Sequence, residues 1–129
     1  MDRISSNARA LANYLDGHSL VERVHYPGLV SHPQHNRAKK LFSAFGGIFS
    51  IEIKEQIDCF DFINRLDLIA CASNLGDTRT LCIPVAHSIY HEMGPVRRKE
   101  MGIADSLIRF SVGIEEFDDL RSDLERSLI

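Results

Sequence analysis

The stretch Leu107-Ile108-Arg109-Phe110-Ser111-Val112-Gly113-Ile114-Glu115 is the most informative part of this sequence. Ile108, Phe110 and Val112 alternate with polar or small residues, as in a strand with one face on an apolar core. Arg109 is therefore predicted to point away from the apolar layer. A guanidinium on a strand presents a rigid fork of donors, which makes Arg109 a candidate to bind the carboxylate of an amino acid. An internal salt bridge or a solvated arginine, the common situation for a strand arginine, explains the same pattern.

Helical and extended segments alternate over the rest of the chain. The predicted helices cover residues 4–16, the segment from Pro33 to the Gly46-Gly47 stop, 57–66, 94–101 and 117–128, and the predicted strands cover 21–26, 48–53, 68–72, 81–83 and 107–112. The 68–72 segment is uniformly apolar, so we expect a buried strand there. The order predicts a layered α/β domain with helices on one or both faces of a sheet of four to five strands.

The composition indicates one domain covering residues 1–129 and argues against several kinds of partner. The chain has 129 residues, 44% of them hydrophobic, and a formal net charge of -3 with charges of both signs interspersed. A weakly negative chain with mixed charges is unsuited to binding the phosphates of a nucleic acid. No apolar run is long enough to span a membrane. Three cysteines without a Cys-x-x-Cys pair lie in apolar stretches, where a small hydrophobe would serve as well. We therefore expect a reducing, cytoplasmic environment.

A second candidate for ligand binding is Asn74-Leu75-Gly76-Asp77, which directly follows the predicted buried strand. Glycine lets backbone approach a ligand, and the Asn74 side chain can both donate and accept hydrogen bonds. A plain turn capped by Asn74 and Asp77 explains the same residues.

The histidines do not predict a metal site. His87 and His91 have the i, i+4 spacing of helical zinc ligands, but their order differs from that of the zinc protease motifs. His32 and His35 flank Pro33, where a helix is expected to begin, and no third ligand lies nearby. No metal is therefore expected.

Several stretches in fixed order resemble the C-terminal part of the trans-sulfuration enzymes of cysteine and methionine metabolism. This family includes cystathionine γ-synthase, the cystathionine lyases, methionine γ-lyase and the homoserine-ester sulfhydrylases, which use pyridoxal phosphate as an electron sink. The matching stretches span nearly the whole chain: Val24-His25-Tyr26-Pro27-Gly28-Leu29, Ser31-His32-Pro33-Gln34-His35, Phe45-Gly46-Gly47, Asn74-Leu75-Gly76-Asp77 and Leu107 to Glu115.

The resemblance implies a specific fold and site. It implies the small C-terminal domain of fold-type I pyridoxal phosphate enzymes, with a mainly antiparallel sheet, and a homo-oligomer, a tetramer by family habit. In the family, the arginine at the position of Arg109 binds the substrate's α-carboxylate, and the residue at the position of Asn74 lies beside that carboxylate. The family loop commonly reads Ser-Leu-Gly, so Asn74 is a departure. Ile83-Pro84-Val85-Ala86-His87-Ser88 is another, because many relatives read His-Pro-Ala there.

The family's cofactor lysine and phosphate-binding residues belong to a larger preceding domain, absent from this chain. Lys39, Lys40, Lys54 and Lys99 occur in contexts unlike that cofactor site. We therefore expect the cofactor-binding domain to be the missing partner, an amino acid to be the substrate, and the isolated chain to be inactive. Two alternatives are an amino-acid-binding module without catalysis, and an assembly domain whose first and last helices cover another subunit.

Overall fold

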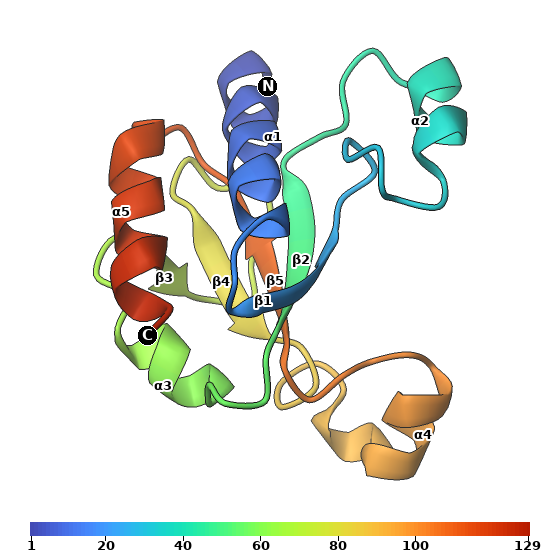
Figure 1. The fold of residues 1–129 in the computed structure, drawn as a ribbon, viewed down its shortest axis with the longest axis vertical. Helices are drawn as coiled ribbons and strands as arrows, with labels where there is room; N and C mark the ends of the chain where they lie inside the picture. Colours follow the sequence, from blue (N-terminus) through green and yellow to red (C-terminus); the bar gives the residue numbers. More distant parts are fainter.

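The computed structural model describes residues 1–129 and contains one sheet with helices around it (Figure 1). Its elements are α1 (Asp2–Asp16), β1 (Val21–His25), α2 (His35–Leu41), β2 (Ile48–Ile53), α3 (Cys59–Asn64), β3 (Ala70–Cys71), β4 (Leu81–Pro84), the 3-10 helix η1 (His91–Met93), α4 (Pro95–Glu100), β5 (Leu107–Ser111) and α5 (Phe117–Ser127). No helix combines the length and the apolar character needed to cross a membrane.

The five strands are arranged in the order β1-β2-β5-β4-β3. The β1/β2, β2/β5 and β4/β5 pairs are antiparallel, and only β3 pairs with its neighbour β4 in parallel. The predicted α/β class with a mainly antiparallel sheet of four to five strands is confirmed, and the sheet has five strands. β5 lies at the centre of the sheet, so the stretch that decides the fold has a hydrogen-bonded neighbour on each side.

Helices α1, α3 and α5 cover one face of the sheet and enclose the core. Ile108, Phe110 and Val112 point into this core, as their alternation predicts. The fully buried side chains of the two long helices include Leu11, Leu15, Leu120 and Leu124. The apolar faces of α1 and α5 are thus buried against the core of this chain. The alternative in which these faces cover another subunit is therefore wrong. In Figure 1, α2 and α4 lie at the periphery.

The opposite face of the sheet carries the candidate site. Cross-strand partners there form the row His25, Ser50, Arg109 and Ile83, running from β1 through β2 and β5 to β4. At the β1/β2 end of this face, a hydrogen bond joins His25 Nε2 and Glu52 Oε1 at 2.6 Å. Arg109 is therefore placed near the middle of the sheet, away from the apolar core.

Two predicted elements differ from the structure. The helix expected to run from Pro33 to Gly46 begins at His35 and ends at Leu41, because Phe42 already has extended backbone. The strand expected over 68–72 is reduced to β3, an edge strand that pairs on one side only. Ile69 is buried, but Cys71 is exposed, so the prediction of a fully buried strand is wrong.

The cysteines occupy different environments. Cys59 and Cys82 are buried, as expected of small hydrophobes, whereas Cys71 is exposed on the edge strand. Burial raises the pKa of the Cys82 thiol to about 12, so this thiol stays protonated at neutral pH. Burial likewise raises the pKa of Cys59. Cys82 therefore packs in the core in its neutral form.

Candidate amino-acid carboxylate site

The guanidinium of Arg109 is held by a backbone carbonyl and not by an acid. Its Nη2 donates to the Ser73 carbonyl oxygen at 2.9 Å, and no carboxylate lies within ion-pair distance of the guanidinium. The Nε–H is buried and has no hydrogen-bond partner. The internal salt bridge considered from the sequence is therefore wrong. A cation that is oriented by a neutral acceptor keeps its charge and its remaining donors available for an anionic ligand.

Two hydrogen bonds attach the Ser73–Gly76 loop to β5. Besides the bond from Arg109 to Ser73, the Gly76 N–H donates to Ser111 Oγ at 2.9 Å. Gly76 has a φ of +75°, which a side chain would strain. Ser111 is buried next to Val112, so its hydroxyl is a fixed acceptor. The strand thus positions both the guanidinium and the loop beside it.

Asn74 lies next to the carbonyl that Arg109 contacts, and its side chain is exposed without a hydrogen bond to the protein. The turn is capped by Asp77 alone, whose carboxylate accepts from the Arg79 N–H and the Thr78 hydroxyl. The Arg79 N–H and the Thr78 contacts lower the pKa of the Asp77 carboxyl. The structural capping role considered for Asn74 therefore falls to Asp77, and the Asn74 amide is free to contact a ligand.

A buried polar network behind the loop was missed by the sequence reasoning. Glu115 accepts from the Thr80 N–H at 2.6 Å and from the Thr80 hydroxyl at 2.8 Å. The same hydroxyl accepts from the Gly113 N–H at 2.9 Å, and Asn7 of α1 donates to the carbonyls of Gly113 and Glu115. The only sequence signal was Glu115 at the end of an apolar strand. The network fixes the point at which the loop returns into β4, at Thr80.

Replacing Gly113 with alanine is expected to lower the free energy of unfolding of the chain by about 1–3 kcal/mol. A Cβ at this position would lie 2.2 Å from the Thr78 carbonyl oxygen and 2.6 Å from the Arg79 carbonyl carbon, so backbone would have to move. Urea unfolding followed by circular dichroism measures the change.

The matched control for this substitution is Gly17→Ala. No heavy atom lies within 4 Å of a Cβ there, and the backbone φ is -95°. We expect its free energy of unfolding to change by less than about 0.5 kcal/mol. Equal destabilisation by the two substitutions would contradict the close packing of Gly113 against the backbone of Thr78 and Arg79.

Two of the four histidines considered for a metal site, His87 and His35, are engaged in contacts within the protein. The His87 ring packs against Phe60 at 5.0 Å between centroids, and its Nε2 donates to the Asp105 carbonyl at 3.1 Å. His35 Nδ1 donates to the Pro27 carbonyl, and its ring stacks on Phe45. No three His, Cys, Asp or Glu side chains gather as a metal site would require.

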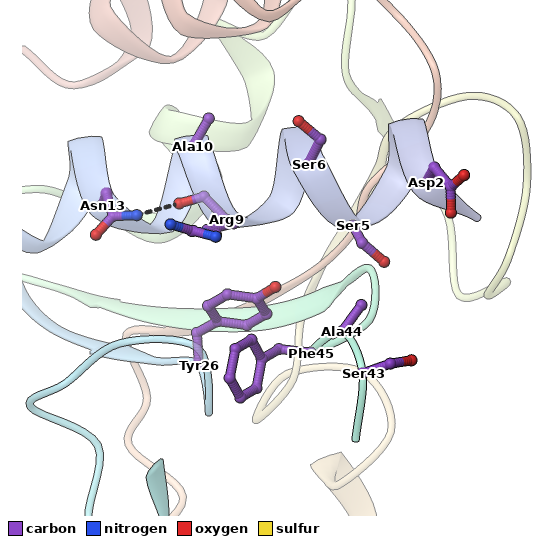
Figure 2. A pocket seen from close by; sticks show the side chains of 10 residues that line it. All are labelled: Asp2, Ser5, Ser6, Arg9, Ala10, Asn13, Tyr26, Ser43, Ala44 and Phe45. Carbon is purple, nitrogen blue, oxygen red and sulfur yellow. Dashed lines mark hydrogen bonds between the residues drawn. The ribbon is translucent and has the colours of Figure 1, made fainter. Parts of the chain in front are cut away.

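A hollow of about 470 Å³ lies elsewhere, between α1 and the segment leading into β2. Figure 2 shows polar side chains of α1, including Arg9, on one side of it and the rings of Tyr26 and Phe45 on the other. The Tyr26 hydroxyl donates to the Gly46 carbonyl, and burial raises the Tyr26 pKa. Neither Arg109 nor Asn74 lines this hollow, so its size does not make it the candidate site.

Comparison with known proteins identifies the family to which this fold belongs. The family model described as Cys/Met metabolism PLP-dependent enzyme matches residues 1–129, and the chain belongs to this family. Among curated proteins, it is 40% identical to an O-succinylhomoserine sulfhydrylase of Pseudomonas aeruginosa and 42% identical to a cystathionine beta-lyase of Coxiella burnetii. Both matches cover 99% of this chain, but 32% and 33% of those proteins.

A solved structure resembles the whole chain just as closely. The cystathionine gamma-lyase from Lactobacillus plantarum complexed with L-serine superposes with a TM-score of 0.94 at 34% identity, over 98% of this chain and 33% of that protein. The chain thus spans about a third of the length of the relatives it matches.

Proposed function

We propose that the chain is the C-terminal part of a pyridoxal phosphate-dependent trans-sulfuration enzyme that acts on a sulfur amino acid or a homoserine ester. Within that enzyme, the chain binds the α-carboxylate of the substrate through Arg109. The observation that carries the proposal is the guanidinium itself, which a neutral carbonyl orients and no acid neutralises.

The donors of Arg109 suit a carboxylate in geometry as well as in charge. With Nη2 held by Ser73, the planar fork can turn little, so a ligand carboxylate would meet donors of fixed direction. The exposed Asn74 amide beside Ser73 would contact the bound carboxylate or the adjacent amino group. Fixing the carboxylate orients the bonds at Cα, and orientation of this kind can supply several kcal/mol of a barrier reduction.

The relatives support this substrate class by what their names share. O-succinylhomoserine, cystathionine and the L-serine bound in the Lactobacillus plantarum enzyme are all α-amino acids. They differ in the side chain that reacts and agree in the α-carboxylate. A site that recognises only this common group is consistent with relatives that carry out different reactions.

The residues of this chain do not fit covalent attachment of pyridoxal phosphate. Such attachment requires a lysine amine that is buried or shifted by its neighbours. Lys39, Lys40 and Lys99 are exposed, and Lys54 is only partly covered at the end of β2. We therefore assign the cofactor and its electron-sink chemistry to the other two-thirds of the enzyme, and the isolated chain is inactive.

A cofactor titration tests the proposal. The purified chain is mixed with pyridoxal phosphate and an amino-acid substrate, dialysed, and examined for bound-cofactor absorbance and for release of α-keto acid. The same measurements are made on the complete enzyme. We expect a retained band and turnover only in the complete enzyme. Retention of the cofactor by the chain alone would overturn the assignment, and carboxylate binding without turnover in the complete enzyme would favour an amino-acid-binding module.

A further inference from the structure

The α2 region is a local concentration of positive charge. No Asp or Glu occurs between Val24 and Ile51, whereas the chain as a whole has a net charge of -3. Arg37, Lys39 and Lys40 of α2 are exposed, and none of them forms an ion pair. Their charges are therefore not neutralised within the chain.

The same region exposes three large apolar side chains. Val30 is 87% exposed, Leu41 63% and Phe42 59%. In Figure 1, α2 projects from the body of the molecule. Single exposed apolar residues are common, but a group beside unpaired cations marks an interaction surface. We call Val30, Arg37, Lys39, Lys40, Leu41 and Phe42 the α2 surface.

Two hollows flank Phe42 and give the α2 surface its shape. One, of about 470 Å³, has Val30 and Lys39 in its wall together with Arg9 of α1. The other, of about 340 Å³, is lined by Leu41 and Arg37. Each hollow thus combines an apolar wall with at least one cation. The first also shares Arg9 and Phe45 with the hollow of Figure 2, so the recessed surface continues along α1.

Contacts at its first turn attach α2 to the rest of the chain. Ala38 is the one buried residue of the helix. The hydrogen bond from His35 Nδ1 to the Pro27 carbonyl, at 2.8 Å, fixes the first turn, and the His35 ring stacks on Phe45 with centroids 5.5 Å apart. The helix is therefore fixed at its first turn, while Leu41 and Phe42 at its other end stay uncovered.

We propose that the α2 surface is a docking surface for the cofactor-binding two-thirds of the complete enzyme, which contacts it through acidic side chains flanking at least one large apolar side chain. This inference rests on the proposed function. The relatives are about three times as long as this chain, and its own core already covers the apolar faces of α1 and α5. Charge complementarity then requires acids opposite Arg9, Arg37 and Lys39, and the apolar group requires an apolar anchor.

Hydroxyl-radical footprinting with mass spectrometry tests the docking. The oxidation rates of Leu41 and Phe42 are compared in the isolated chain and in the complete enzyme. Burial in an interface is expected to lower both rates about fivefold or more. Val96, which is exposed at the other end of the molecule on α4, is the internal control for radical dose. Unchanged rates for Leu41 and Phe42 in the complete enzyme would overturn the proposal.

Charge reversal tests the acidic character of the partner surface. In the complete enzyme, Lys39→Glu with Lys40→Glu is expected to raise the oxidation rates of Leu41 and Phe42 toward those of the isolated chain, whereas Lys99→Glu on α4 should leave them unchanged. Circular dichroism of each variant checks folding. Oxidation rates of Leu41 and Phe42 that do not change in the double variant would overturn the proposal that the partner surface is acidic.

Two further experiments identify what binds the α2 surface and separate this proposal from the proposed function. Protection that rises with the concentration of the isolated chain would assign the α2 surface to a second copy and overturn the proposal, as would binding of the chain to anionic lipid vesicles that protects the same residues. Arg109→Ala in the complete enzyme should weaken substrate binding, seen as a raised KM, and leave the protection intact. Protection without any pyridoxal phosphate-dependent turnover would refute the proposed function while supporting the docking.

Discussion

Replacing Asp123 with asparagine is expected to lower the free energy of unfolding of the chain by about 3 kcal/mol, because a carboxylate with several buried partners is lost. Asp123 is fully buried, and its oxygens accept from the N–H groups of Asp67, Leu68 and Ile69 at 2.9, 3.0 and 3.0 Å. Arg126 donates to the same carboxylate at 3.1 Å. An asparagine amide would turn an NH₂ group toward donors that need an acceptor.

Urea unfolding of the variant beside Asp119→Asn measures this effect. Asp119 lies on the same helix, is exposed and forms no ion pair, so its replacement should change the free energy of unfolding by less than about 0.5 kcal/mol. If Asp123→Asn proved as mild as this control, the segment before β3 would not depend on α5 for its hydrogen bonds.

Replacing Arg109 with alanine is expected to reduce kcat/KM of the complete enzyme roughly 30- to 1000-fold, which corresponds to about 2–4 kcal/mol for truncating one partner of a desolvated charge pair. Because the proposed contact exists in the bound substrate as well as in the transition state, much of the loss should appear as a raised KM. Lysine at this position keeps the charge but lacks the second arm of the fork, so Arg109→Lys should recover only part of the loss.

Steady-state kinetics on an α-amino acid substrate measures these changes, with Arg121→Ala as the control. Arg121 forms a surface pair with Asp118 on α5, and its removal should leave kcat and KM unchanged. A kcat/KM of Arg109→Ala near that of the unmodified enzyme would show that another group binds the carboxylate. A KM restored by alkylguanidinium added to Arg109→Ala would support direct contact.

The sequence predicted those features that depend on local pattern. The alternation around Arg109 correctly separated Ile108 and Phe110, in the core, from the guanidinium on the other face. The turn at Gly76 was equally visible, because a positive φ selects glycine. The order of elements was sufficient to infer a layered α/β domain.

What the sequence did not predict depends on contacts between distant segments. Asp123 reads as one more acid on an amphipathic helix, and only the tertiary fold brings it to the N–H groups near Ile69. Thr80 and Glu115 are 35 residues apart in the chain, and nothing local to either one indicates their pairing. The exposure of Cys71 follows from the place of β3 at the sheet edge, which hydropathy alone does not reveal.

The central place of β5 also determines when the sheet can form. β1 and β2 can pair with each other early, as can β3 and β4, but each pair keeps an open edge until β5 enters between β2 and β4. Isolated two-stranded units are only marginally stable in water. Joining the two pairs through β5 requires contacts between segments that lie far apart in the chain. Of the five strands of this sheet, β5 is the last in chain order and so the last to be synthesised. Completion of the sheet and positioning of Arg109 against Ser73 are therefore one late step, and a nascent chain without β5 has neither the five-stranded sheet nor the proposed carboxylate site.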